Sequence, residues 1–284
     1  MITFVTGHGI GNQIQALPAL QKTIAKYGEV TVFVSGCNVE LSRTIFGHMA
    51  PVTNNLDDVL HSDGQVLMAP CQDHPLPLNP LFVRTIHMIS GASEVEANIR
   101  AVHPATYKED FRVPLLPIEP LPAPDVVFAN GYSKQDVARW QAKEWPYYRD
   151  LAVMLKGAGL TVGSLGSTNE YVEGTENLTG RSFSESLGIL KGSKVLVAND
   201  IGLYHAACVV GTPCCVIFTF TDPVKNYDPR FHEDTTVIRR DLTCSPCMKG
   251  IGGDAVWVKN RPKCQWACRD IRPEQVLTEV MRYV

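Results

Sequence analysis

The residues best suited to chemistry lie between Asn199 and Ala207, in the order Asn-Asp-Ile-Gly-Leu-Tyr-His-Ala-Ala. This segment follows an apolar, strand-like run and opens a helix-like run. Asp200 is placed to cap that helix, so the free backbone N–H groups of its first turn would face an incoming anion such as a diphosphate. Those N–H groups belong to Ile201, Gly202 and Leu203. Taken alone, the same pattern also fits a simple helix cap and a buried core histidine at His205.

A second candidate ligand loop runs from Gly7 to Asn12 as Gly-His-Gly-Ile-Gly-Asn, between a strand-like and a helix-like run. Glycines let a backbone approach a ligand closely, and the start of a helix favours an anion or a polar sugar. The spacing is G-x-G-x-G and differs from the G-x-G-x-x-G of dinucleotide sites. A ligand loop and an ordinary tight turn therefore both remain open.

Four of the nine cysteines form two pairs at chelating spacing. They are Cys244 with Cys247, and Cys264 with Cys268. Two such pairs supply four thiolates for a tetrahedral site, with zinc as the default ion and iron as the alternative. We expect a structural metal, because four protein ligands leave no open position for substrate. Two disulfides or four free thiols are the other interpretations.

Short β-branched runs alternate with helix-like stretches, which predicts parallel sheets covered by helices and hence an α/β fold. The predicted strands are 2–6, 30–34, 65–69, 126–130, 161–165, 195–198 and 214–218. Helical spacing of apolar residues predicts a first helix from Gln13 to Tyr27, with Pro18 tolerated in its first turns. Pro273 opens an amphipathic run that predicts a last helix.

A proline-rich stretch from Val113 to Pro124 divides the chain, because proline lacks the N–H donor that helices and sheets need. We expect an N-terminal domain over residues 1–122. We expect a C-terminal domain with the cysteine loop over 123–272, and a final helix over 273–284.

The composition, 45% hydrophobic and 19% charged, is typical of a globular protein. A formal net charge of −3 gives no general attraction to nucleic acid. The N-terminus has no basic leader, and no apolar run reaches the roughly 18 residues of a membrane span, so we expect a cytoplasmic protein without an integral membrane segment. The remaining cysteines are expected to be reduced core residues: Cys37, Cys71, Cys208, Cys214 and Cys215.

The segments around Asp200 resemble the heptosyltransferase-like glycosyltransferases, family 9, which build bacterial lipopolysaccharide cores and related glycans. Members carry a strand, then N-D-x-G-x-x-H-x-A, then G-T-P, an apolar strand and T-D-P. In this sequence the later elements are Gly211-Thr212-Pro213 and Thr221-Asp222-Pro223, in the same order. Further similar elements are Lys143-Glu144-Trp145-Pro146, the strand end Leu165 to Glu170, Asn177-Leu178-Thr179-Gly180, and the opening Gly9 to Asn12 with Leu17 to Leu20. Residues 30–120 match no motif.

The resemblance implies the GT-B fold, two Rossmann-like domains facing across a cleft, with a nucleotide-diphosphate sugar held mainly by the C-terminal one. It implies that the N–H groups of residues 201–203 hold the diphosphate, that Lys143 neutralises a phosphate and that Glu170 takes the ribose hydroxyls. Asp200 and His205 would fix the loop or touch the ligand. Without the resemblance, Lys143 and Glu170 also fit solvated surface charges. The other positions assigned to the sugar donor are Gly9, Gly11, Asn12 and Ser133.

The family inverts the anomeric centre by direct displacement, which needs a base on the acceptor side and no divalent cation. Its opening motif has an aspartate where this sequence has Asn12, and asparagine cannot accept a proton at neutral pH. The candidate bases are Asp73 and His8, with His74 as a third. Asp73 and His74 follow a predicted strand, and such loops line the cleft of open α/β sheets. Asp73 also fits an ordinary loop aspartate.

The sequence therefore predicts an inverting hexosyl- or heptosyltransferase that uses a nucleotide-diphosphate sugar. The acceptor could be a saccharide, a protein or a modified nucleobase. A catalytically silent nucleotide-sugar binding protein, with turnover lost through the change at Asn12, is the alternative. A dinucleotide-dependent oxidoreductase would need the G-x-G-x-x-G fingerprint that this sequence lacks.

Overall fold

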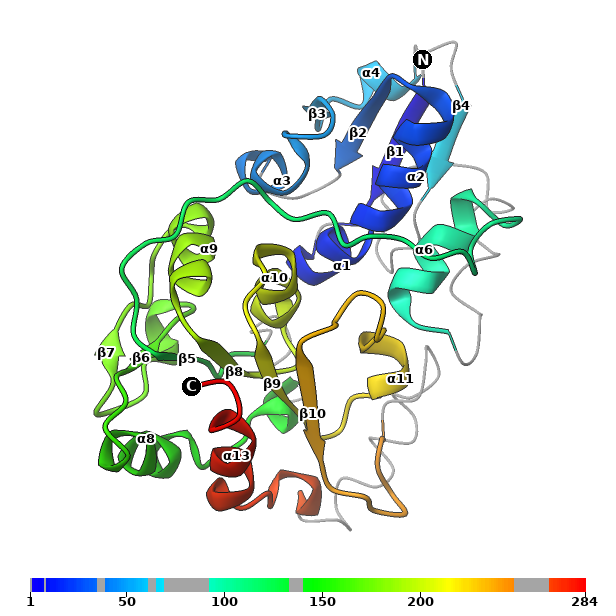
Figure 1. The fold of residues 1–284 in the computed structure, drawn as a ribbon. Helices are drawn as coiled ribbons and strands as arrows, with labels where there is room; N and C mark the ends of the chain where they lie inside the picture. Colours follow the sequence, from blue (N-terminus) through cyan, green and yellow to red (C-terminus); the bar gives the residue numbers. More distant parts are fainter. Residues whose placement is uncertain are drawn as a thin grey trace. The chain divides into compact units, whose positions relative to one another are not determined.

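The computed structural model describes residues 2–7, 9–34, 39–60, 65–68, 92–132, 140–247 and 266–284. The chain divides into two compact units. The first comprises Met1–Pro117 with Tyr227–Phe231, and the second Ile118–Asn226 with His232–Val284. Each unit has a parallel sheet with helices, which confirms the expected α/β class (Figure 1). Within the described residues, no helix has the length and apolar character needed to cross a membrane.

The first unit is built on a four-stranded sheet with the order β3-β2-β1-β4. Its strands are β1 (Ile2–Thr6), β2 (Val30–Val34), β3 (Val52–Thr53) and β4 (Gln65–Met68). Its helices are α1 (Ile10–Gln15), α2 (Leu17–Tyr27), α3 (Val39–Phe46), α4 (Asp57–Leu60) and α6 (Glu94–Val102). β1 is an inner strand with Phe4 and Val5 fully buried, so the glycine loop that follows it starts at the carboxyl edge of the sheet.

The predicted single helix from Gln13 to Tyr27 is wrong, because the structure has two helices, α1 and α2, that meet at Ala16. Pro18 has no N–H to donate to the preceding turn, and it lies in the first turn of α2, where that donor is not needed. The chain still continues as helix after Ala16, whose carbonyl oxygen accepts from the Leu20 N–H at 3.0 Å.

The short segment Tyr227–Phe231 belongs to the first unit although its sequence neighbours belong to the second. Its Asp228 carboxylate is buried, accepts a hydrogen bond from the Ser93 hydroxyl at 2.6 Å and pairs with Arg230 at 2.8 Å. Burial raises the pKa of Asp228, but the hydrogen bonds from Arg230 and Ser93 outweigh it, and the net direction is downward. An ionised carboxylate therefore holds this segment on the first unit.

The second unit is built on a six-stranded sheet with the order β10-β9-β8-β5-β6-β7, all pairs parallel. Its strands are β5 (Val126–Ala129), β6 (Val162–Ser164), β7 (Glu176–Asn177), β8 (Val195–Asn199), β9 (Cys214–Phe218) and β10 (Thr235–Arg239). Figure 1 shows them side by side from β7 to β10. In chain order this is the doubly wound arrangement, whose strand order reverses between β5 and β8.

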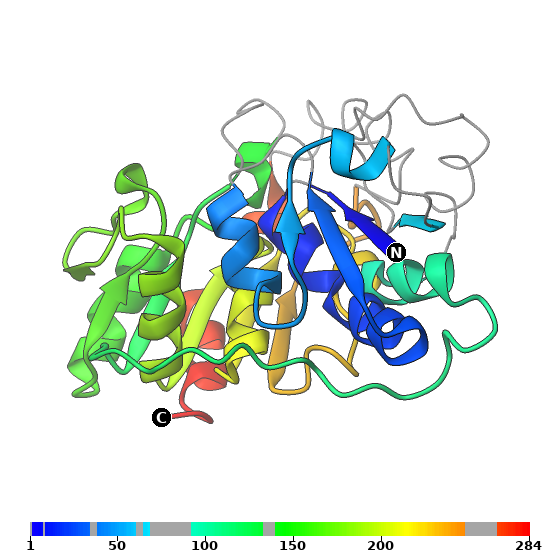
Figure 2. The ribbon, with the colours of Figure 1, turned by 90° about the horizontal axis from the view of Figure 1, so that it is seen from above.

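Helices cover both faces of this second sheet. The helical segments are η1 (Gln141–Lys143), α8 (Tyr148–Gly157), η2 (Thr168–Glu170), α9 (Phe183–Gly192), α10 (Gly202–Val210), α11 (Pro223–Asn226), η4 (Ala267–Arg269) and α13 (Pro273–Val280). α8 packs with α13, and α9 packs with α10; the turned view shows this second pair side by side (Figure 2). The predicted last helix is confirmed as α13, which buries Val276 and Val280.

The C-terminal end of α9 tolerates no side chain at Gly192, because a Cβ there would lie 1.9 Å from the carbonyl oxygen of Leu121. We expect Gly192→Ala to lower the free energy of unfolding by about 1–3 kcal/mol, the usual cost of overpacking. Gly157→Ala is the matched control, since Gly157 also ends a helix and has nothing within 4 Å of the added Cβ. It should leave stability unchanged or slightly higher. Urea unfolding of both variants checks this, and equal stabilities would contradict the prediction.

Candidate functional site at the switch point of the second sheet

Two neighbouring strands end at the point where the strand order of the second sheet reverses. β5 and β8 pair in parallel, with Ala129 opposite Ala198. The buried side chain of Asn199, at the end of β8, donates to the carbonyl oxygens of Asn130 at 2.7 Å and Gly131 at 3.2 Å. Ligands of open α/β sheets bind outside the carboxyl ends of the strands at such a point. The loop after β8 therefore lies where a ligand is expected.

Asp200 begins that loop as a buried charge with several partners. Its carboxylate Oδ2 accepts from Lys143 Nζ at 3.2 Å and from Asn226 Nδ2 at 2.8 Å, and Lys143 also donates to its backbone carbonyl oxygen. Burial raises the pKa of Asp200, but Lys143, His205 and the Thr221 hydroxyl outweigh it and lower the pKa overall. Asp200 is therefore an anion at neutral pH.

The predicted cap of the following helix is wrong. The N-cap of α10 is Ile201, with no side chain accepting from the first turn, and the Asp200 carboxylate binds Lys143 and Asn226 instead. A buried carboxylate gains more from an ammonium partner than from helix N–H groups, because its charge needs an opposite charge when water is removed. Residues 201–203 are partly exposed. The start of α10 is consequently left for an external acceptor, which the helix dipole favours if it is anionic.

Behind the start of α10 lies a buried histidine pair. His205 Nδ1 and His232 Nε2 are 3.0 Å apart, and the two residues are 4% and 0% exposed. The Tyr204 ring stacks on His232, with ring centroids 4.7 Å apart and planes at 19°. Burial, then His232 and Lys143, lower the pKa of His205 to about 3 against an opposing effect of Asp200. His205 is therefore neutral at physiological pH.

Glu170 lies at the next strand end along the sheet, after β6. It closes a capping box in which its Oε2 accepts from the Ser167 N–H at 2.9 Å. A Cβ at Gly131 or Gly166 would come within 2.4 Å or 2.2 Å of its carboxyl group. Glycine at both positions thus lets this carboxylate lie against the loops that follow β5 and β6.

Comparison with known proteins finds a matching family model, a related protein and similar solved structures. Residues 118–251 match the model of glycosyltransferase family 9 (heptosyltransferase). Lipopolysaccharide heptosyltransferase 1 of Pseudomonas aeruginosa is 29% identical over 139 residues, which cover 45% of this chain and 37% of that protein. The structure of E. coli ADP-heptose lps heptosyltransferase II has a TM-score of 0.63 at 15% identity, covering 99% of this chain and 98% of the other.

The iron-containing dodecameric glycosyltransferase TibC of enterotoxigenic E. coli H10407 is a second similar solved structure. It has a TM-score of 0.70 at 15% identity, and the alignment covers 99% of this chain and 76% of TibC. A second TibC structure is a complex with ADP-D-β-D-heptose. The match to the family model covers 134 of the 284 residues and lies almost entirely in the second unit. The GT-B class expected for the whole chain agrees with the fold of these solved structures.

The segment that matches the family model brings together part of the predicted site. Lys143, Asp200 and His205 are linked by hydrogen bonds or electrostatic interactions at the start of α10, and Glu170 lies at the next strand end. Gly9, the N-cap of α1, Gly11 and Asn12 belong to the first unit. The remaining predicted residues lie outside the described residues: His8, Asp73, His74, Ser133 and Cys264.

Two residues that contact this site were not predicted from the sequence. Asn226 binds the Asp200 carboxylate, and His232 contacts His205. Both flank Tyr227–Phe231, the segment that belongs to the first unit. Neither residue lies in a motif with a recognisable spacing. The only signal is that Asn226 closely follows the T-D-P element at 221–223.

Two cysteines of the predicted metal site pack against η1, the turn that carries Lys143. Cys247 and Cys268 are buried in one cluster with Ala142 and Phe220. Cys244, Cys247 and Cys268 are all free of disulfides, so that alternative is wrong for these three. Among the described residues, which exclude Cys264, no three His, Cys, Asp or Glu side chains form a group that could hold a metal. Cys208, Cys214 and Cys215 are likewise free thiols, the last two buried as expected.

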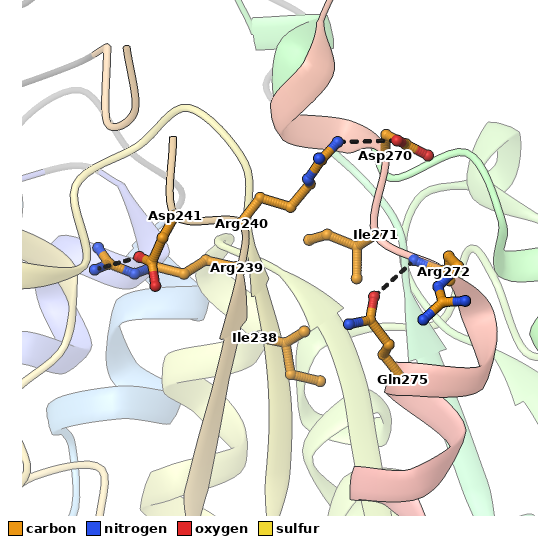
Figure 3. A pocket seen from close by; sticks show the side chains of 8 residues that line it. All are labelled: Ile238, Arg239, Arg240, Asp241, Asp270, Ile271, Arg272 and Gln275. Atoms are coloured by element: carbon orange, nitrogen blue, oxygen red, sulfur yellow. Dashed lines mark hydrogen bonds and ion pairs between the residues drawn. The ribbon is translucent and has the colours of Figure 1, made fainter. Parts of the chain in front are cut away.

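A concavity of about 410 Å³ lies beyond the end of β10 and the start of α13 (Figure 3). It is lined by Ile238, Arg239, Arg240, Asp241, Asp270, Ile271, Arg272 and Gln275. Arg239 pairs with Asp241 at 3.0 Å and Arg240 with Asp270 at 2.9 Å, so two of its cations are already neutralised. None of the predicted site residues lines it. We therefore assign the candidate site to the strand ends and not to this concavity.

The buried neutral His205 makes stability depend on pH. Its pKa is about 3 in the folded protein and 6.5 in the unfolded chain, so as the pH falls through 6.5 the unfolded chain takes up a proton that the folded chain does not. This one group should lower the free energy of unfolding by about 1.4 kcal/mol between pH 7.5 and 5.5. His205→Gln should flatten the pH dependence by that amount in urea unfolding. Identical slopes for the two proteins would contradict the assignment.

Proposed function

We propose that this protein is an inverting glycosyltransferase that moves a hexose or heptose from a nucleotide-diphosphate sugar to an acceptor. The observation that carries the proposal is the uncapped start of α10 at the switch point, beside the Lys143–Asp200 ion pair and within the segment that matches the family model. The chain spans 37% of the length of the curated heptosyltransferase that it matches. ADP-D-β-D-heptose, which TibC binds, is the first sugar donor to test.

In the proposed mechanism the leaving diphosphate accepts hydrogen bonds from the N–H groups of residues 201–203. A helix start and a nearby ammonium stabilise negative charge as it develops on the leaving group, which is the main demand of glycosyl transfer. Lys143 supplies that ammonium, and Asp200 keeps it at the site with their 3.2 Å ion pair. Glu170, whose carboxyl group lies close to the loop after β5, accepts hydrogen bonds from the ribose hydroxyls. No divalent cation is required by this arrangement.

The acceptor side belongs, in this proposal, to the first unit. Gly9, Gly11 and Asn12, at the start of α1 in the same unit, are proposed to contact the sugar donor, because glycine permits close backbone approach. Asn12 cannot act as the base, so we keep Asp73 and His8 as the proposed bases, with His74 as the third. The acceptor itself, a saccharide, a protein or a modified nucleobase, remains to be found by screening.

We also propose that the four cysteines of the C-terminal stretch bind one structural zinc or iron ion. The thiols of Cys244, Cys247 and Cys268 have the right chemistry for such an ion, and TibC is iron-containing. The ion would stabilise the cysteine-containing segment that packs against Ala142, next to Lys143.

We also propose a cytoplasmic location, a compartment in which cysteine thiols stay reduced. The proposed domains remain 1–122, 123–272 and the helix 273–284.

The diphosphate site can be tested with a charge placed at the start of α10. We expect Gly202→Asp to fold normally, because an acidic residue in the first turn stabilises a helix, but to weaken ADP binding at least tenfold through repulsion of the diphosphate. Gly202→Asn is the matched neutral control and should bind ADP more tightly than Gly202→Asp. Calorimetric titration with ADP measures both. Equal affinities of the two variants for ADP would contradict the assignment of the diphosphate to this position.

Incubation of the wild-type chain with ADP-D-β-D-heptose separates an enzyme from a binding protein. Slow release of free heptose from ADP-D-β-D-heptose by the wild-type chain supports an enzyme. Tight binding without any turnover, with or without candidate acceptors, would favour the catalytically silent nucleotide-sugar binding protein.

The metal proposal is tested by elemental analysis of protein purified without added metal. We expect about one zinc or iron per chain, lost in Cys247→Ser together with thermal stability, because binding energy of a structural metal is folding energy. Cys215→Ala is the control, since Cys215 is a buried residue of β9 outside the cysteine pairs. It should keep the metal. A metal-free wild-type chain with four alkylatable thiols at these positions would refute the proposal.

A further inference from the structure

The buried pair His205 and His232 has a role that no motif of the sequence describes. Their facing nitrogens, His205 Nδ1 and His232 Nε2, are 3.0 Å apart, so one proton lies between them. Both rings lie away from water, and His232 is held further by its stack on Tyr204. The pair is thus rigid, and the position of the shared proton decides what the outer nitrogen of His205 offers to a ligand.

A neutral imidazole has one nitrogen that donates and one that accepts. If His205 Nδ1 carries the shared proton, its Nε2 has only a lone pair. If His232 Nε2 carries it, His205 Nε2 must carry a proton and becomes a donor. Two groups outside the pair act on His205: Asp200, from the loop after β8, and Lys143, from η1. Asp200 acts on His205 more strongly than the opposing charge of Lys143, so the net effect of the two favours an N–H over a lone pair on the outer nitrogen, and a bound diphosphate would favour it more strongly.

His205 is the fourth residue of α10, and helical side chains lean toward the helix N-terminus, over the preceding turn. The ring therefore lies over the turn whose N–H groups we assigned to the diphosphate. Of the two histidines His205 alone has any exposure, 4% against 0%. A ligand at the start of α10 would therefore contact His205 and not His232.

We propose that His232 is a positioning residue whose Nε2–H donates to His205 Nδ1 and so fixes the tautomer of His205 that presents Nε2–H to the diphosphate of the sugar donor. This inference rests on the proposed function of the α10 start. His205 then acts as a neutral hydrogen-bond donor beside Lys143, which avoids placing a second cation next to that ammonium. No proton is transferred in this role.

The tautomer is measured directly on the full chain without any ligand. Long-range ¹H–¹⁵N spectra of protein labelled at histidine distinguish protonated from unprotonated ring nitrogens, and His205→Gln assigns the His205 signals. We expect His205 to have a protonated Nε2 and an unprotonated Nδ1, and His232 to have a protonated Nε2. A proton on His205 Nδ1 would overturn the proposal, whether or not the chain binds nucleotide.

Three variants of His232 test the consequence for binding. His232→Phe keeps an aromatic ring for Tyr204 but has no N–H. His232→Gln carries an amide nitrogen near the position of Nε2, whereas His232→Asn carries it near Nδ1. Because a hydrogen bond to a charged group is lost, we expect ADP affinity to fall about tenfold in the Phe and Asn variants and about twofold or less in the Gln variant.

Calorimetry with ADP and the histidine spectra together decide the outcome. Rescue by Gln but not by Asn supports a positioning role, because simple packing would not distinguish two amides by the place of their nitrogen. Unchanged ADP affinity in a folded His232→Phe, or equal losses in the Gln and Asn variants, would overturn it. A wild-type chain that does not bind ADP would count against the proposed function, while the wild-type spectrum would still decide the role of His232.

Discussion

The buried carboxylate of Asp200 is the constraint on which the rest of the site depends. A charge with 3% exposure is strongly unfavourable unless opposite charge and hydrogen-bond donors surround it. Lys143 and Asn226 meet that need from η1 and α11, so both segments must stay beside the loop after β8. With its carboxylate committed to them, Asp200 leaves the first turn of α10 uncapped. The requirement to neutralise one acid thus creates the position where an external anion can bind.

The same requirement connects the site to regions that look unrelated in the sequence. Ala142, next to Lys143, packs with Cys247 and Cys268, and its carbonyl oxygen accepts from the Thr219 hydroxyl at 2.6 Å. The cysteine stretch therefore supports the turn that carries the cation. On the other side, Asn226 and His232 flank a segment that belongs to the first unit and is held there by Asp228.

The comparisons are strongest where this site lies. The family match covers residues 118–251, which include β5, β8 and α10, and the structural match to heptosyltransferase II covers 99% of the chain. Under the proposed function this distribution is expected, because a nucleotide diphosphate fixes the geometry of one loop and one helix start, whereas acceptor surfaces differ in shape and charge. Asn12, where the family resemblance predicts an aspartate, lies outside the matched segment.

The sequence by itself determined several strands of both sheets and the position of the loop after β8. The predicted bounds agree with the structure for three strands, 2–6, 30–34 and 214–218. Short apolar runs rich in β-branched residues favour buried parallel strands, so their positions can be predicted from the sequence. β10 escaped prediction, since its polar residues Thr235, Thr236 and Arg239 suit an edge strand that only pairing with β9 stabilises. Only the tertiary structure decided that Asp200 binds Lys143 and that His232 meets His205. These partners are 57 and 27 residues apart in the chain, and they meet because burial of a charge and of two imidazoles selects whichever polar groups the folded sheet brings within reach.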